Sequence, residues 1–177
     1  MIFAKKSLGQ NFLIDLNIVK KILNQVSIKN KNIIEIGPGN GALTEEIIKR
    51  KPKSLILIEK DKELAKKLSI RFKEEKFITI FNSDILEFNL EEKIRSNGVI
   101  FGNLPYNISS QILVKILKFK KWPPNFSNLI LMFQKELSDK IIGHFKSKNY
   151  GRLSILTNLR LKLLNRFLVS NNCFFPK

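Results

Sequence analysis

Residues 32–49 read NIIEIGPGNGALTEEIIK, and this stretch decides the fold. The apolar run Asn32–Ile36 predicts a buried strand, and the pattern of Ala42–Lys49 predicts a helix directly after it. The glycines at 37, 39 and 41 lie between them, where glycine permits positive φ and close approach of the backbone to a ligand. A bare tight turn is the alternative. The G-x-G-x-G spacing differs from the G-x-G-x-x-G of dinucleotide binders, and alone it does not identify the ligand.

Strand and helix patterns alternate along the rest of the chain. This alternation predicts an α/β fold, with a mostly parallel seven-stranded sheet and helices on both faces. The further strands expected are Ser54–Ile58, Phe77–Phe81, Gly98–Phe101 and Leu129–Phe133. The further helices expected are Lys62–Phe72, Ser109–Leu117 and Lys135–Ile142. Before the first strand, an amphipathic capping helix is expected from the helical spacing of Leu16, Val19, Ile22, Leu23 and Val26. The interpretation of Arg152–Ser170 is open, and Leu161–Val169 within it fits an antiparallel edge strand.

The organisation of the chain indicates one catalytic domain. We expect residues 1–30 to form an N-terminal arm and capping helix, and residues 31–177 to form the ligand-binding body of that domain. No apolar run approaches the roughly 20 residues that cross a bilayer, and the first fifteen positions do not form a signal peptide. A cytoplasmic protein with no membrane partner is therefore expected. Phe174–Lys177 has no closing element, which suggests that a C-terminal extension is missing.

The distribution of charge indicates a polyanionic partner. The formal net charge is +17, yet twelve of the fifteen acidic residues fall between Glu35 and Glu92. From Lys140 to Lys177 there are eight Lys or Arg residues and no acid. A compositional bias toward lysine is the alternative, but it does not explain why the two signs are separated. Such a field attracts nucleic acid and makes binding dependent on salt.

The single cysteine and the single histidine argue against metal chemistry. Cys173 has no partner in this chain for a disulfide, and His144 alone does not make a zinc site. A zinc-dependent base deaminase, which needs a cluster of such ligands, is disfavoured. We expect both residues to be packing or surface residues, and no bound metal.

Four signals fall at the carboxyl ends of predicted strands. They are Gly37, Glu59, Asp84 and Asn103, spaced 22, 25 and 19 residues apart, each about one βα unit. Ligands of open α/β sheets bind in the crevice at the carboxyl ends of the strands. The four positions are therefore expected to converge on one site.

The acidic residues at two of these strand ends have candidate ligand roles. Glu59 lies about 20 residues after the glycine loop, where a carboxylate accepts hydrogen bonds from ribose hydroxyls. The alternative is a carboxylate at a helix N-terminus, but Asp61 suits that N-cap role better and leaves Glu59 for the ligand. Asp84 fits a bond to an adenine amino group, or equally a turn aspartate.

The sequence Asn103-Leu104-Pro105-Tyr106 suits methylation of an adenine amine. The lone pair of that nitrogen is delocalised into the ring, so two acceptors on its N–H groups are needed to expose it. The Asn103 side-chain oxygen and the Pro105 carbonyl, whose direction proline restricts, fit these two acceptors. The Tyr106 ring fits stacking on an extruded base. The alternative is an Asn-capped turn before a helix.

The chain resembles the ribosomal RNA adenine N6,N6-dimethyltransferase family, in particular its bacterial small-subunit members, over essentially all of its length. The resemblance rests on separate motifs in the right order: Leu8–Asp15, the glycine loop, Gly102–Ser109, Gln134–Glu136 and Tyr150–Ser154. It implies a Rossmann-like class I fold that binds S-adenosylmethionine as methyl donor. It also implies a small helical C-terminal domain, absent here, that helps to dock the ribosomal particle.

The resemblance also implies roles for particular residues. The cofactor-binding residues would be Asn11, Leu13, Gly37, Gly39, Glu59, Asp84 and Asn103. The target adenine would be held by the catalytic residues Asn103, Pro105 and Tyr106, with Phe174 beside it in a Phe-x-Pro loop, where Phe175 competes for that role. The expected substrate is small-subunit rRNA in a pre-ribosomal particle, with two adjacent adenines near the 3′ end dimethylated by a monomeric enzyme.

Three other functions remain to be separated by experiment. A large-subunit rRNA methyltransferase of the macrolide-resistance type shares the Asn-x-Pro-Tyr core. A non-catalytic RNA-binding assembly factor would keep the fold but lose one of the motifs. A nicotinamide-dependent oxidoreductase would bind a dinucleotide and leave Asn103–Tyr106 unexplained.

Overall fold

The glycine loop lies between β2 (Asn32–Ile36) and α2 (Ala42–Lys49) in a computed structural model of the protein, which describes residues 9–176. Both bounds equal those predicted from the sequence. Gly37, Gly39 and Gly41 have φ of 67°, 58° and 86°, values that residues with a Cβ rarely adopt. The glycines therefore allow the chain to leave β2 and turn at once into α2.

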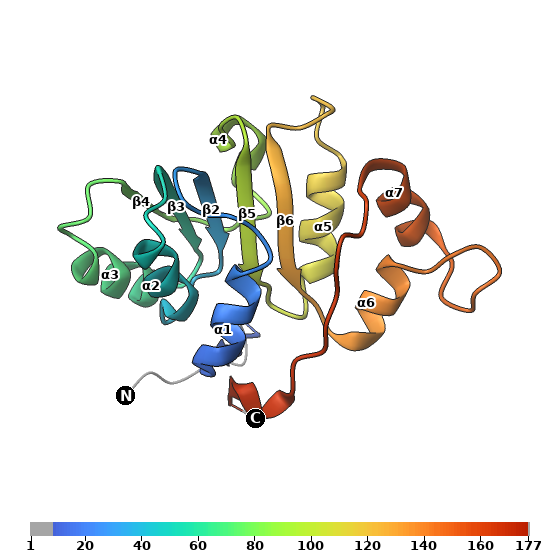
Figure 1. The fold of residues 1–177 in the computed structure, drawn as a ribbon, viewed down its shortest axis with the longest axis horizontal. Helices are drawn as coiled ribbons and strands as arrows, with labels where there is room; N and C mark the ends of the chain where they lie inside the picture. The colour runs from blue at the N-terminus through green and yellow to red at the C-terminus, as the bar shows by residue number, and fades with distance from the viewer. Residues whose placement is uncertain (1–8, 177) are drawn as a thin grey trace.

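The main sheet has five strands in the order β4-β3-β2-β5-β6, and every neighbouring pair is parallel (Figure 1). The strands besides β2 are β3 (Ser54–Glu59), β4 (Ile78–Asn82), β5 (Gly98–Asn103) and β6 (Phe126–Met132). The helices besides α2 are α1 (Leu16–Leu23), α3 (Lys62–Arg71), α4 (Leu90–Lys93), α5 (Ser109–Leu117), α6 (Lys135–Ile141) and α7 (Arg152–Arg160). The predicted α/β architecture with a mostly parallel sheet is confirmed.

The two faces of the sheet carry alternate residues of each strand. Ile33 of β2, Leu55 and Leu57 of β3 and Phe101 of β5 belong to a buried cluster with residues of α1 and α2. Ile34, Ile36, Ile58 and Ile100 belong to a second cluster with residues of α4 and α5. Because both faces are covered, the central strands read as nearly continuous apolar runs.

Residues 9–176 form a main sheet of five strands, not the seven predicted. Leu161–Val169, which fits an edge strand by sequence, forms no ladder with another described strand. Its exposed side chains include Lys162, Leu163 and Leu164, so no continuous apolar face is presented to the sheet. Two further strands of two residues each, β1 (Phe12–Leu13) and β7 (Phe174–Phe175), pair with each other instead. The sequence analysis missed both, because a two-residue strand has no periodicity.

The N-terminal segment is tied to the sheet by α1 and by this small ladder. Asp15 is the N-cap of α1, and its carboxylate accepts the N–H groups of Asn17 and Ile18. Val19, Ile22 and Leu23 bury the inner face of the predicted capping helix. The ladder pairs Leu13 with Phe174 in antiparallel register. Residues 9–13 are thereby held across the carboxyl ends of the strands.

Candidate active site

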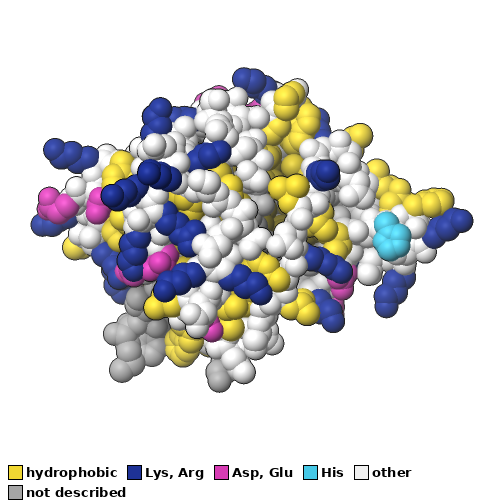
Figure 2. Space-filling model, in the orientation of Figure 1, with side chains coloured by type: hydrophobic (Ala, Val, Ile, Leu, Met, Phe, Trp, Pro, Cys, Tyr) yellow, Lys and Arg dark blue, Asp and Glu magenta, His cyan; other side chains and the backbone are white. Residues whose placement is uncertain are grey.

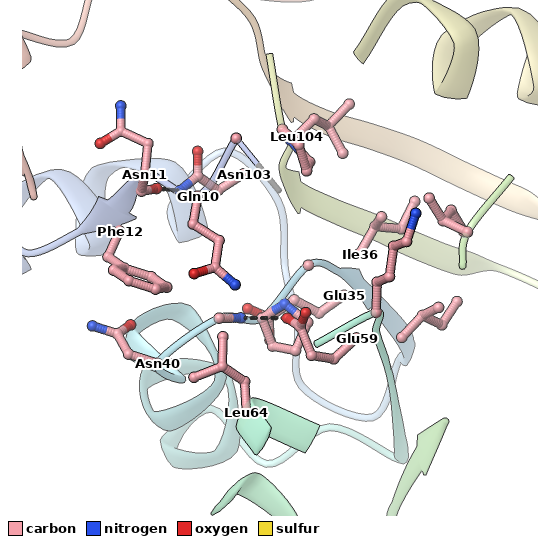
Figure 3. Close-up of a pocket in the computed structure, with 18 of the residues that line it drawn as sticks. Gln10, Asn11, Phe12, Glu35, Ile36, Asn40, Glu59, Leu64, Asn103 and Leu104 are labelled. Atoms are coloured by element: carbon pink, nitrogen blue, oxygen red, sulfur yellow. Dashed lines mark hydrogen bonds between the residues drawn. The ribbon is translucent and has the colours of Figure 1, made fainter. Parts of the chain in front are cut away.

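A pocket opens at the carboxyl ends of β2, β3 and β5, beneath the N-terminal segment (Figure 3). The sheet register aligns these ends: Ile36 pairs with Ile58 and with Gly102, and Glu59 pairs with Asn82. Most of the predicted site residues contribute to its lining, namely Asn11, Leu13, Gly37, Gly39, Glu59, Asp84, Asn103 and Pro105. The predicted convergence of four strand ends is therefore present in the structure.

The glycine loop forms one wall and leaves little space for side chains. A Cβ at Gly39 would lie 3.0 Å from the ring of Phe12, and one at Gly37 would lie 3.6 Å from the Asn103 carbonyl oxygen. The Gly39 amide donates a 3.0 Å hydrogen bond to Oε2 of Glu59. The loop, β3 and the N-terminal segment are thus in direct contact.

Glu59 is more constrained than the sequence analysis predicted. Asp61 is the expected N-cap of α3 and accepts the N–H of Glu63 and of Leu64. Glu59 also has structural partners: Oε1 accepts the Asp61 amide at 2.8 Å, and Oε2 accepts that of Gly39. The side chain is 7% exposed, and burial raises its pKa. Each carboxylate oxygen has a second lone pair, so Glu59 positions the loop while it retains acceptors for a ligand.

Asp84 forms an ion pair that spacing did not predict. Its Oδ2 accepts Lys60 Nζ at 2.7 Å, and its Oδ1 accepts the Leu86 amide at 2.9 Å. Lys60 is the main cause of the lowered pKa of Asp84. The hydrogen bond from the Leu86 amide is typical of an aspartate in a turn, which is the alternative role that the sequence leaves open for Asp84. The ammonium group competes with any ligand amine for Oδ2.

Glu35 is a pocket residue that the sequence analysis did not select. It is 1% exposed, and its Oε2 accepts the Thr44 hydroxyl of α2 at 2.7 Å. Burial raises its pKa from 4.5 to about 8. With that pKa, the carboxyl is protonated in most molecules at neutral pH. Figure 3 shows it deep in the pocket beside Glu59. One signal was available: Glu35 is an acid flanked by isoleucines in a strand predicted to be buried.

Asn103 is oriented by the N-terminal segment. Its side-chain Nδ2 donates a 2.7 Å hydrogen bond to the Asn11 carbonyl, so its Oδ1 is the group left to act as an acceptor. The Asn11 side chain donates at 3.0 Å to the hydroxyl of Tyr106, whose ring is 37% exposed. Tyr106 does not line the pocket itself but lies next to it through this bond. The Pro105 carbonyl accepts the Ile108 amide at 3.2 Å, which leaves one lone pair for another donor.

Phe174 is, after Tyr106, the second predicted site residue that is not part of the pocket lining. It is 7% exposed and belongs to the buried cluster under α1, with Leu13 and Val19. Phe175 is 52% exposed. Phe174 pairs with Leu13 and Phe175 pairs with Phe12, and both of these partners line the pocket. Two adjacent residues of a strand point to opposite faces, so Phe174 packs inward while Phe175 is exposed, and the place of either ring beside the target base stays a prediction.

Within residues 9–176 the chain has neither a candidate metal site nor a helix that could span a membrane. No group of three or more His, Cys, Asp or Glu side chains in that range is placed to hold a metal ion. Within the same range, no helix is both long and apolar enough to cross a membrane.

The parallel sheet, the glycine loop and the pocket at the strand ends define a class I methyltransferase fold. Among solved structures, a dimethyladenosine transferase from Plasmodium falciparum aligns with a TM-score of 0.72 and 29% identity, over 84% of this chain and 52% of that one. The 23S rRNA methyltransferase ErmE aligns with a TM-score of 0.68 and 25% identity, over 82% and 56%.

The chain belongs to the ribosomal RNA adenine dimethylase family, whose model matches residues 2–177. A ribosomal RNA small subunit methyltransferase A from Pelagibacter ubique is 46% identical over 98% of this chain and 66% of its own length. Its counterpart from Malacoplasma penetrans is 43% identical over 99% and 62%. The chain thus spans slightly less than two thirds of the length of these relatives.

Proposed function

We propose that the protein transfers methyl groups from S-adenosylmethionine to the N6 amine of adenine in RNA, and that two adjacent adenines near the 3′ end of small-subunit rRNA are its target. The proposal rests on one observation above all. Asn11 contacts both Asn103 and Tyr106: its backbone carbonyl accepts a 2.7 Å hydrogen bond from Asn103 Nδ2, and its side-chain amide donates a 3.0 Å hydrogen bond to the Tyr106 hydroxyl. These contacts orient the acceptor and the aromatic ring that methylation of an adenine amine requires.

The residues of the pocket fit S-adenosylmethionine. Asn11 Oδ1 is buried and has no hydrogen-bond partner within residues 9–176, and a buried polar atom of this kind calls for a donor. Glu59 would accept the ribose hydroxyls and Asp84 the adenine amino group, with Gly37 and Gly39 against the backbone side of the ligand. When bound, this cofactor supplies an electrophilic methyl group on a sulfonium.

The side chains next to the pocket prepare the amine for transfer. The Asn103 oxygen and the Pro105 carbonyl would accept its two N–H groups, which draws the nitrogen lone pair out of conjugation. Tyr106 would stack on the extruded base in place of its neighbours in the RNA. No strong base is required, because the amine proton becomes acidic only as the new N–C bond forms and then leaves to solvent. Orientation and electrostatic positioning would supply the rate.

The relatives support the RNA substrate and its setting. Their names refer to ribosomal RNA of the small subunit, and the net charge of +17 suits a polyanion. We infer that the protein acts as a cytoplasmic monomer on the pre-ribosomal particle. We also infer that the arm and capping helix at 1–30 belong to the same catalytic domain as residues 31–177. The contacts of residues 9–13 with the pocket support this assignment, and residues 1–8 lie outside the described part.

Two measurements test the proposal. Calorimetric titration should show binding of S-adenosylmethionine and none of a nicotinamide dinucleotide. Methyl transfer to immature small subunits should exceed transfer to naked large-subunit rRNA, and Asn103→Ala should reduce it by about 10²–10³-fold, the usual effect of one positioned polar group. Asn165→Ala is the matched control, because this exposed asparagine bonds only surface groups that lie outside the pocket lining, the Gln25 side chain and the Arg166 amide. RNA binding without cofactor binding would contradict the proposal and favour the non-catalytic assembly factor.

A further inference from the structure

The loop between α6 and α7, residues 143–150, presents two aromatic rings to solvent. Phe145 is 70% exposed and Tyr150 is 41% exposed. The rings meet edge to face, with centroids 5.8 Å apart and an interplanar angle of 86°. Neither ring belongs to the buried clusters of the described chain. Large aromatic side chains are usually buried on average, so their exposure here is a feature to be explained.

The backbone of the loop is folded against itself. Ser147 donates its amide to the His144 carbonyl at 2.9 Å, and Tyr150 donates to the Ser147 carbonyl at 3.0 Å. A Cβ at Gly143 would lie only 2.5 Å from the Asn149 carbonyl oxygen, so the two ends of the loop are in close contact. A surface held in this way loses less conformational entropy on binding than a flexible one.

The charge around the rings is positive. Lys146 Nζ lies 5.8 Å from the centroid of the Phe145 ring, and Lys148 and Arg152 are exposed nearby in the chain. Figure 2 shows basic and hydrophobic side chains beside the lone histidine at this end of the molecule. The preceding helix α6 carries Glu136 and Asp139, and Asp139 faces Arg166 at 3.6 Å. The loop itself contains no acid.

We propose that the loop at residues 143–150 is a stacking platform for unpaired bases of the RNA substrate, at a place separate from the pocket that takes the target adenine. Exposed rings interleaved with cations suit single-stranded RNA, because the bases stack on the rings while Lys and Arg neutralise the phosphates. Duplex RNA hides its base faces and is recognised by shape and backbone. The inference rests on the proposed function, since it assigns further contacts to the same substrate.

Binding of a fluorescently labelled single-stranded RNA to the full chain tests the platform, with a duplex of the same sequence as comparison. We expect the combined replacement of Phe145 and Tyr150 by alanine to weaken single-strand binding about tenfold or more and to change duplex binding far less. Phe145→Tyr should retain the affinity, whereas Phe145→Leu, which keeps an apolar side chain without a flat ring, should weaken it by part of the loss seen in the double variant. Full affinity with leucine would overturn the stacking role and favour a protein-docking surface.

Titration with S-adenosylmethionine on the same variants separates this inference from the proposed function. The cofactor affinity should be unchanged in every loop variant, which also shows that each variant is folded. If the parent binds cofactor but not single-stranded RNA, or if the alanine variant binds both as the parent does, the platform is wrong and the cofactor pocket stands. If the parent binds the single strand through these rings but not the cofactor, the platform stands and the proposed function fails.

Discussion

Replacement of Glu35 by glutamine should change how the stability of the protein depends on pH. The carboxyl is buried beneath the glycine loop, accepts the Thr44 hydroxyl at 2.7 Å, and has a pKa of about 8 against 4.5 when unburied. Since the folded pKa is the higher one, the native state binds more protons than the unfolded chain between these two values. The favourable contribution is therefore complete below about pH 4.5 and is lost as pH rises toward 8.

The size of the effect follows from the two pKa values. By linkage, ionisation of Glu35 lowers the free energy of unfolding by about 1 kcal/mol at pH 5 and by about 3 kcal/mol at pH 7, relative to a side chain that stays neutral. Glutamine cannot ionise, and its amide oxygen still accepts the Thr44 hydroxyl. The difference in unfolding free energy between Glu35→Gln and the parent should therefore shift by about 2 kcal/mol in favour of the variant as the pH rises from 5 to 7. Glu59, the neighbouring carboxylate that also raises the pKa of Glu35, is present in both proteins, so its own titration largely cancels in the difference.

Urea unfolding of the parent and of Glu35→Gln at half-unit steps from pH 5 to pH 8 measures this difference. Glu92→Gln, which removes an exposed carboxylate from α4, is the matched control and should show no comparable trend. A difference between Glu35→Gln and the parent that stays constant with pH would refute the reasoning. So would a pH trend equal to that of the control, because it would mean that Glu35 ionises as freely as a surface residue.

Two further changes test the pocket by calorimetric titration with S-adenosylmethionine. Gly39→Ala forces a residue with a Cβ to a φ of 58° and sets that Cβ 3.0 Å from the Phe12 ring, so it should cost about 1–3 kcal/mol of stability and weaken cofactor binding at least tenfold. Gly151→Ala is the control, because the backbone there is extended and nothing lies within 4 Å, and it should change neither quantity. Equal effects of the two substitutions would contradict the role of the glycine loop. Lys60→Met removes a cation that is bonded to Asp84 at 2.7 Å, so it should tighten binding of the cationic cofactor a few-fold, whereas weaker binding would show that Lys60 assists the ligand.

The strand ends illustrate how far spacing along the chain leads. Gly37, Glu59, Asp84 and Asn103 were expected at one crevice, and all four line the pocket. Parallel βα units repeat at a regular interval and bring their carboxyl ends to one edge of the sheet. The hydrogen-bond partners at that edge were not predictable in the same way. Lys60 bonds Asp84, which lies 24 positions further along the chain. Spacing predicts which side chains lie at the same edge of the sheet, but it does not predict which of them form hydrogen bonds or ion pairs with each other.

The sequence by itself determined the local units and their direction. Asn32–Lys49 contains the period of a buried strand, glycines where positive φ is needed and the period of a helix, and the structure has the same bounds. Such features depend on neighbours within a few residues, and the chain order carries them. Packing in three dimensions is the origin of the hydrogen bond from Asn103 to Asn11, 92 residues away, of the raised pKa of Glu35 and of the burial of Phe174. Each of these depends on which distant groups exclude water or offer a hydrogen bond, and only packing in three dimensions sets that environment.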